Sequence, residues 1–163
     1  MTTLDQLTAR DIMRTDVLSV SEDMNVRELA GLLTDRMISG APVVDEDNQL
    51  CGVVSLTDIV ANEGKRQAIR GGEHVGDFFL QGWEDELDET DLRPFHVIGD
   101  DDMSVSDIMT SIIYSVDESA SLAEMADAMI SGRIHRLLVT RNGEMVGIVS
   151  TMDLLRALRS TAS

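Results

Sequence analysis

The sequence predicts a mixed α/β (α+β) fold in which one β-α-β-β-α unit occurs twice. The main observation is an internal repeat: Asp11-Ile12-Met13 returns 96 residues later as Asp107-Ile108-Met109. After a one-residue difference in loop length, Gly52-Val53-Val54-Ser55 returns 95 residues later as Gly147-Ile148-Val149-Ser150. A repeat of this length indicates one supersecondary unit built twice. With 163 residues, the chain forms one compact domain or two small domains in close association.

Each copy begins with a short run of β-forming residues, followed by a helix. The first strands are expected at residues 17–20 and 113–116, where β-branched and other apolar residues dominate. A capping residue with a glutamate three positions later then marks a helix start in both copies, at Asn25 and at Ser121. Apolar residues recur at helical spacing after each start, which predicts two amphipathic helices.

Two further strands and a closing helix complete each copy. The strands are expected at residues 41–44 and 50–54, and again at 137–140 and 145–149. The link in the second copy contains Asn142-Gly143, a pair typical of tight hairpins. The closing helices are expected to begin near Ser55 and Ser150. These elements give three regions: a first repeat at 8–62, an insertion at 63–103, and a second repeat at 104–162.

The insertion differs in composition from both repeats. It starts with basic residues, carries a small apolar patch (Phe78, Phe79, Leu80 and Trp83), and ends in an acidic run. The patch indicates a partly ordered segment that docks onto another surface. A solvated, flexible loop is the alternative, because acidic runs usually have that role. The sequence favours neither interpretation.

Composition and charge exclude several classes of protein. The net charge of −17 disfavours nucleic acid and anionic membrane surfaces as partners. No apolar run approaches the ~20 residues that span a bilayer, and the N-terminus lacks the pattern of a secretory signal. We therefore expect a cytoplasmic protein. A single cysteine, Cys51, excludes an internal disulfide and a cysteine-based metal cluster.

The sequence carries none of the common enzyme signatures. The sequence has no phosphate-binding loop, nucleophile elbow or paired-histidine metal motif. His74 and His96 are interpreted as surface residues of the insertion. Asp100, Asp101 and Asp102 are more simply a solvated acidic run than a metal site. We expect no catalytic residues, no bound metal and no required cofactor.

The two closing motifs resemble those of a known family. Gly52-Val53-Val54-Ser55-Leu56-Thr57-Asp58 and Gly147-Ile148-Val149-Ser150-Thr151-Met152-Asp153 both read Gly-hydrophobic-x-Ser-x-x-Asp, and both copies open with Asp-Ile-Met. This pattern resembles tandem CBS domains, the Bateman module, here as a stand-alone pair with a long insertion. The resemblance implies two repeats about a pseudo-twofold axis, sheets packed face to face, and clefts between the repeats that hold adenosine-type ligands.

The resemblance also implies which residues would bind such a ligand. The ribose would meet Asp58 or Asp153, with Ser55 and Ser150 offering hydroxyl groups beside them. Arg136 would be the best-placed phosphate ligand, and His135 precedes it. In the first copy the base would lie against Val17, Leu18, Ala41, Pro42 and Val43. In the second copy the base would lie against Ile113, Tyr114, Leu137, Leu138 and Val139.

Physical chemistry allows two roles for these aspartates. A carboxylate can accept both hydroxyl groups of a ribose, and backbone N–H groups at a helix start favour phosphate oxygens. Ser-x-x-Asp is also a helix-capping pattern that needs no ligand. The two copies are not equivalent, because Gly40 stands where the second copy has Arg136, and Leu138 stands where the first has Pro42.

These observations leave two classes of function open. The first is a regulatory sensor of AMP, ADP, ATP (with or without Mg²⁺) or S-adenosylmethionine, which signals in trans to an unknown protein effector or through a homodimer. The second is a ligand-free structural dimer whose insertion binds a protein partner. A thiol-based redox regulator is a weaker third alternative, because Cys51 is expected on a core strand.

Overall fold

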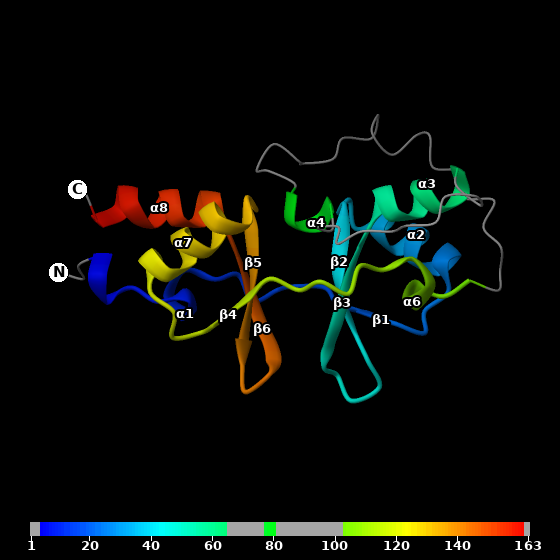
Figure 1. Ribbon diagram of the computed structural model, residues 1–163, viewed down its shortest axis with the longest axis horizontal. Helices are drawn as coiled ribbons and strands as arrows, with labels where there is room; N and C mark the ends of the chain where they lie inside the picture. Colours follow the sequence, from blue (N-terminus) through cyan, green and yellow to red (C-terminus); the bar gives the residue numbers. More distant parts are fainter. Residues whose placement is uncertain (1–3, 65–76, 81–102, 162–163) are drawn as a thin grey trace. The chain divides into compact units, whose positions relative to one another are not determined.

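The computed structural model describes residues 4–64, 77–80 and 103–161 and confirms a mixed α+β fold (Figure 1). Each repeat contributes one three-stranded sheet with two helices. The first repeat contains β1 (Val20–Ser21), α2 (Val26–Asp35), β2 (Gly40–Val44), β3 (Leu50–Ser55) and α3 (Leu56–Gly64). The second contains β4 (Ser115–Asp117), α7 (Leu122–Gly132), β5 (Arg136–Arg141), β6 (Glu144–Ser150) and α8 (Thr151–Thr161). The other described elements are η1 (Leu4–Gln6), α1 (Ala9–Ile12), α4 (Asp77–Leu80) and α6 (Val105–Ile108).

The two sheets have the same topology and the same irregularity. The first strand pairs in parallel with the second, which pairs antiparallel with the third, in the orders β1-β2-β3 and β4-β5-β6. The register shifts once in each hairpin, at Val43/Val44 and at Val139/Thr140. Asn142 and Gly143 both have positive φ, as the predicted tight hairpin requires.

The first strand of each copy begins later than its apolar pattern predicted. The expected strand at 17–20 is reduced to β1 at Val20–Ser21, and that at 113–116 becomes β4 at Ser115–Asp117. Residues 17–18 and 113–114 therefore lie before the strands, in the segments that lead into the two sheets.

The starts of α2 and α7 lie where their capping residues predicted them. Asn25 caps α2 by accepting from the Arg27 N–H at 2.7 Å, and Ser121 forms the full reciprocal box with Glu124.

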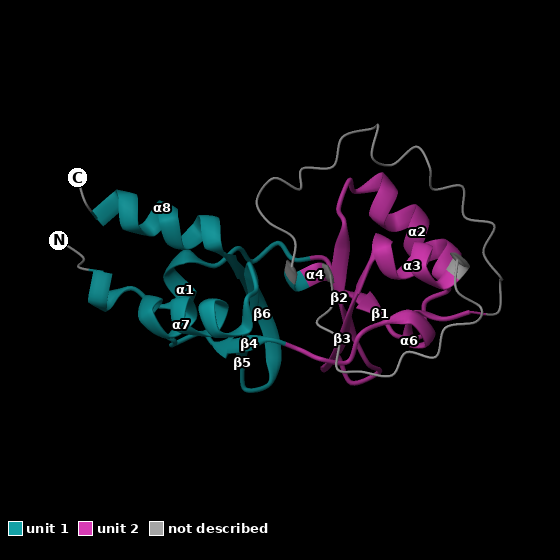
Figure 2. Cartoon of the chain, turned by 45° about the horizontal axis from the view of Figure 1, so that its top comes forward, with its two compact units in different colours: residues 1–17, 79–84, 114–163 teal, residues 18–78, 85–113 magenta. Residues whose placement is uncertain are grey.

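The compact units do not coincide with the sequence repeats (Figure 2). Unit 1 comprises residues 1–17, 79–84 and 114–163, so α1 belongs with the elements of the second repeat. Unit 2 comprises 18–78 and 85–113, so α6 belongs with the elements of the first repeat. Each repeat therefore gives its opening segment, residues 4–17 in the first repeat and 103–113 in the second, to the unit formed by the other repeat.

Backbone hydrogen bonds attach each opening segment to its unit. In unit 1, Arg14 and Ile148 exchange both N–H···O bonds at 2.9 Å, and the Ala9 N–H donates to Ala120 O at 2.8 Å. In unit 2, Val53 and Thr110 exchange the same pair of bonds at 2.9 Å. A two-residue bridge thus extends each hairpin with a segment from the other repeat.

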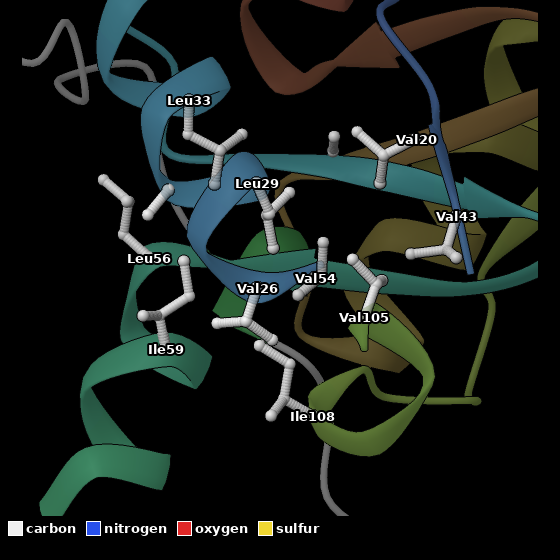
Figure 3. Close-up of a cluster of buried hydrophobic side chains, with 12 residues drawn as sticks. Val20, Val26, Leu29, Leu33, Val43, Val54, Leu56, Ile59, Val105 and Ile108 are labelled. Carbon is white, nitrogen blue, oxygen red and sulfur yellow. The ribbon is translucent and has the colours of Figure 1, made fainter. Parts of the chain in front are cut away.

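The core of unit 2 shows that this exchange contributes to packing (Figure 3). Val105 and Ile108 of α6 are 0% and 5% exposed, and they pack with residues from β1, α2, β2, β3 and α3. The members from the first repeat are Val20, Val26, Leu29, Ala30, Leu33, Ala41, Val43, Val54, Leu56 and Ile59. The hydrophobic core of this unit is therefore incomplete without α6.

None of the described helices combines the length and apolar character that a membrane span needs.

Candidate ligand sites

The two Ser-x-x-Asp motifs lie at equivalent junctions between the last strand of a sheet and the helix that follows it. Asp58 Oδ2 accepts from Ser55 N at 2.8 Å and from Ser55 Oγ at 3.1 Å. Asp153 Oδ2 accepts from Ser150 N at 2.8 Å and from Ser150 Oγ at 2.9 Å. In both units one carboxylate oxygen therefore caps the helix start, as the ligand-free interpretation predicted.

The two aspartates are buried, which separates them from ordinary surface caps. Asp58 is 4% exposed and Asp153 is 6% exposed. The second oxygen of Asp153, Oδ1, accepts from Arg156 Nη1 at 3.1 Å. The Arg156 side chain is 62% exposed, so this ion pair is weakly held. Ala61 stands at the position equivalent to Arg156 in the first copy.

The helix starts offer fewer backbone donors than the sequence suggested. In unit 1, Ser150 N donates to Asp153, Thr151 N donates to His135 O at 2.9 Å, and Asp153 N donates to Ser150 Oγ at 3.3 Å. Unit 2 repeats this pattern, with Leu56 N donating to Ser39 O at 2.8 Å. Because these amides already have partners, a phosphate cannot use them without breaking the cap.

The strand that precedes each Ser-x-x-Asp motif lies beside it in the sheet. The β5–β6 register pairs Arg136 with Ser150, and the β2–β3 register pairs Gly40 with Ser55. The guanidinium-bearing residue and the capping serine are thus neighbours in unit 1. The residues predicted to contact phosphate and ribose are therefore adjacent in the β5–β6 ladder of unit 1. His135, next to Arg136, is exposed.

The predicted apolar walls are mostly core residues. Ala41 and Val43 are 0% exposed and belong to the core cluster of unit 2, and Pro42 is also buried. Leu137 and Leu138 are 1% and 0% exposed in unit 1. Such side chains support a site from behind, so their main chains, rather than their side chains, are what a base would meet.

The four residues that precede the sheets are half-buried and divide between the units. Leu18 and Ile113 belong to unit 2, whereas Val17 and Tyr114 belong to unit 1. Tyr114 O accepts from Leu138 N at 3.1 Å, which fixes Tyr114 beside β5. Unit 1 therefore holds Tyr114, His135, Arg136, Ser150 and Asp153 together.

The insertion contributes residues that were not assigned to a site from the sequence. Phe78 and Phe79 of α4 are 2% and 0% exposed, so these two members of the predicted apolar patch are docked. The Phe79 ring meets the Tyr114 ring edge-to-face, with centroids 5.2 Å apart and planes at 74°. His135 N donates to Phe79 O at 2.8 Å. The Leu80 side chain, Trp83, His74, His96 and Asp100–Asp102 lie outside what the structure describes.

Unit 1 also contains an ion-pair cluster, around the buried carboxylate of Glu118, that sequence reasoning missed. The Glu118 side chain is 8% exposed and accepts from both Arg10 and Arg141, each through Nε and Nη2, at 2.5–3.1 Å. These charge-assisted bonds lower the pKa of Glu118 to about 2. Nothing in the spacing of Arg10, Glu118 and Arg141 identifies the cluster, because it depends on the exchanged opening segment.

The remaining chemistry gives little support to redox or metal functions. Burial and the neighbouring Glu22 carboxylate raise the pKa of the Cys51 thiol, whereas a reactive thiol needs a lowered pKa. Within the described ranges, no cluster of three or more histidine, cysteine, aspartate or glutamate residues is arranged to bind a metal ion.

Comparisons with known proteins agree with this geometry. The family model for the CBS domain matches residues 9–63 and 105–160. An uncharacterised protein of Methanopyrus kandleri, MK0525, is 42% identical over 59 residues; the match covers 36% of this chain and 30% of that relative. Among solved structures, CBSX2 in complex with AMP is 22% identical with a TM-score of 0.65, covering 96% of this chain and 98% of that one.

A second solved structure carries two other adenosine compounds. The CBS domain pair of MJ0100, in complex with 5′-methylthioadenosine and S-adenosyl-L-methionine, is 18% identical to this chain. Its TM-score is 0.63, and the likeness covers 94% of this chain and 97% of that one. At this level of identity, both structures support the fold.

Proposed function

Because the chain belongs to the CBS domain family, we propose that it is a regulatory protein that senses an adenosine-type ligand and catalyses no reaction. The observation that carries this proposal is the buried carboxylate of Asp153, which is held by Ser150, the residue that pairs with Arg136 in the β5–β6 ladder. AMP and S-adenosylmethionine are the first candidates, because two similar folds were solved with these compounds. ADP and ATP are further candidates.

The charge of the chain limits the choice of ligand. A net charge of −17 repels a polyanion unless arginine or Mg²⁺ compensates locally. Arg136 supplies one such charge in the second copy, and Gly40 supplies none at the equivalent position. AMP, S-adenosylmethionine and Mg²⁺-bound ATP are therefore favoured over free ATP. The site with Asp153 is favoured over the site with Asp58.

Recognition of the ribose would use the carboxylate that is already in place. Asp153 Oδ2 stays with Ser150, and Oδ1 exchanges its bond with Arg156 for bonds from the ribose hydroxyl groups. The freed guanidinium is then available to an anionic group on the ligand. The two oxygens of the Asp153 carboxylate would then have separate roles: Oδ2 would cap the helix and Oδ1 would bind the ligand.

The signal would pass in trans, through an unknown protein effector or through the state of a homodimer, in the cytoplasm. Val60 of α3 and Leu155 of α8 occupy equivalent positions in the two repeats, and they are 46% and 56% exposed. Leu158, one turn after Leu155, is 50% exposed. Apolar residues at matched positions of two exposed helix faces suit association with a second copy.

A ligand-free structural dimer is the second candidate. It is favoured by one observation, which is that both Ser-x-x-Asp motifs already cap their helices without a ligand. In that case the aspartates need no second role.

Calorimetric titration of the Asp153→Asn variant separates the two candidates. The asparagine retains one acceptor oxygen for Ser150, and it replaces the second oxygen with a donor that cannot accept a ribose hydroxyl. We expect affinity for AMP or S-adenosylmethionine to fall by about 10–100-fold, the loss expected for a charged hydrogen bond worth about 1.5–3 kcal/mol. GMP serves as the ligand control.

Asp11→Asn is the matched protein control. Asp11 Oδ2 accepts from Thr8 N at 2.8 Å and from Thr8 Oγ1 at 2.9 Å, which is the same cap geometry on another helix of unit 1. Its ligand affinity should equal that of the unchanged protein. Equal losses in both variants would assign the effect to helix capping, and absence of binding to every adenosine compound would favour the structural dimer.

A further inference from the structure

The insertion brings an aromatic side chain, Phe79, into contact with two residues of the candidate site of unit 1. Phe79 is 0% exposed, although its helix α4 has only four residues and its flanks lie outside the described ranges. A helix this short is not stable by itself, so docking must hold it in place. The docking partners include Tyr114, which belongs to the predicted base site, and His135, which precedes Arg136 among the predicted ligand-binding residues.

Phe79 makes the two kinds of contact that a purine base would make there. Its ring lies edge-to-face against Tyr114 at 5.2 Å, a favourable arrangement for two aromatic groups. Its carbonyl oxygen accepts from the His135 main-chain N–H at 2.8 Å. A purine base that forms hydrogen bonds with the main chain just before β5 would need the same donor, the His135 N–H.

The His135 position connects Phe79 with the rest of the site. His135 O accepts from Thr151 N at 2.9 Å, and Thr151 follows Ser150 at the start of α8. The residue that binds Phe79 through its N–H thus contacts the capping motif through its C=O. A base that bonds to His135 would place its ribose toward Ser150 and Asp153.

In unit 2 the neighbouring residue of α4, Phe78, lies close to Gly40. A Cβ atom added to Gly40 would lie 3.2 Å from Phe78 Cδ2. Gly40 pairs with Ser55 in the β2–β3 ladder, as Arg136 pairs with Ser150 in β5–β6. The glycine that replaces a basic residue in the first copy therefore leaves space that an aromatic ring of the insertion uses.

We propose that Phe79 of α4 is an internal occupant of the candidate site in unit 1, so that an adenosine-type ligand binds there only by displacing it. This inference rests on the proposed function. It makes Phe79 a determinant of affinity: the measured dissociation constant equals the intrinsic constant divided by the fraction of molecules in which α4 is undocked.

Proton NMR of the unchanged protein tests the displacement directly. The chain has one tyrosine and three phenylalanines, so the cross-relaxation signal between the rings of Tyr114 and Phe79 can be assigned. We expect this signal in the free protein and its loss on saturation with AMP or S-adenosylmethionine. A signal that persists in the saturated complex would overturn the proposal and leave the proposed function intact.

Calorimetric titration of Phe79→Ala gives a second, independent readout. Removal of the competing ring should tighten binding of the same two compounds by about tenfold or more, because the docked fraction no longer has to be displaced. Ile130→Ala is the control, since Ile130 is 74% exposed on α7 of the same unit, and its affinity should not change.

The remaining outcomes separate the two proposals. If Phe79→Ala binds the ligand with unchanged affinity, the proposal that Phe79 occupies the site is wrong. If it binds more weakly, the proposal is also wrong, and Phe79 is instead a residue that contacts the bound ligand. Binding by Phe79→Ala alone, abolished by adding Asp153→Asn, supports both proposals. Failure of both proteins to bind either compound overturns both.

Discussion

Glu118 shows how much of this structure depends on single charged residues from distant parts of the chain. Its carboxylate accepts two bonds from Arg10, in the opening segment, and two from Arg141, in the β5–β6 hairpin. Bidentate guanidinium–carboxylate pairs are among the stronger charge-assisted interactions. The side chain is 8% exposed and has both oxygens occupied, so it ties the exchanged segment to the sheet of unit 1.

Glu118→Gln should lower the free energy of unfolding at pH 7 and change its pH dependence. The pKa of Glu118 is about 2 in the folded protein, against an ordinary value of 4.5. Because the folded pKa is the lower one, the carboxylate stabilises the fold above about pH 4.5, and this contribution is lost as the pH falls toward 2.

Urea denaturation between pH 2 and pH 7 measures this effect. The difference in unfolding free energy between the unchanged protein and Glu118→Gln should be largest above pH 5 and shrink as the pH falls through the interval from 4.5 to 2. This difference in unfolding free energy reports the ionisation of Glu118 alone, because the other carboxylates titrate in both proteins and their contributions cancel. A difference that does not vary with pH would contradict the assigned pKa.

At the scale of elements, the two motif glycines explain how the opening segments are seated. A Cβ atom at Gly147 would lie 2.6 Å from Met13 Sδ and 2.8 Å from Arg14 O. A Cβ atom at Gly52 would lie 2.8 Å from both Met109 Sδ and Thr110 O. The backbone carbonyls cannot move without breaking the bridges to Ile148 and Val53. Glycine at these positions is therefore a requirement of the exchange, independent of any ligand.

Gly147→Ala should consequently destabilise the protein by about 1–3 kcal/mol, the usual cost of overpacking. Gly31→Ala is the opposite control. Gly31 lies within α2 with nothing within 4 Å of an added Cβ, so alanine should stabilise the protein by about 0.5–1 kcal/mol. Thermal unfolding of the two variants measures both shifts, and a stabilised Gly147→Ala would contradict the close approach of Met13 and Arg14.

The elements differ in how well the sequence predicts them. The hairpins, α2, α7 and the closing helices follow from local signals, such as Asn142-Gly143 and the box between Ser121 and Glu124. The short helices α1 and α6 were missed, although Thr8–Asp11 and Ser104–Asp107 both form capping boxes with a recognisable Ser/Thr-x-x-Asp pattern. Four-residue helices bury too few side chains to produce a visible periodicity.

The candidate site was predictable in part, for a related reason. Ser55, Asp58, Ser150 and Asp153 stand in a local motif whose spacing fixes their geometry. The contacts of Phe79 with Tyr114 and His135 join residues that are 35 and 56 positions apart in the sequence. No local pattern specifies such a pairing, because tertiary packing alone decides it.

At the scale of the whole molecule, the exchange of opening segments determines which pieces of the chain can fold. The core of unit 2 needs Val105 and Ile108, which are 0% and 5% exposed and come from the start of the second repeat. Burying each such side chain contributes about 1.5–3 kcal/mol. Two of them therefore amount to a large part of the ~5–15 kcal/mol that stabilises a typical domain.

A fragment cut at the repeat boundary, 1–62, should accordingly fold poorly, whereas a fragment that spans unit 2, 18–113, should unfold cooperatively. The shorter piece keeps α1, whose partners Glu118 and Ala120 are missing, and it lacks α6. Circular dichroism during urea denaturation measures both fragments. The double substitution Val105→Ser and Ile108→Ser in 18–113 is the control, since it should reproduce the weakness of 1–62 at the longer length. If 1–62 unfolded as cooperatively as 18–113, the repeats themselves would be the folding units. The exchanged segments would then pack onto cores that are already complete without them.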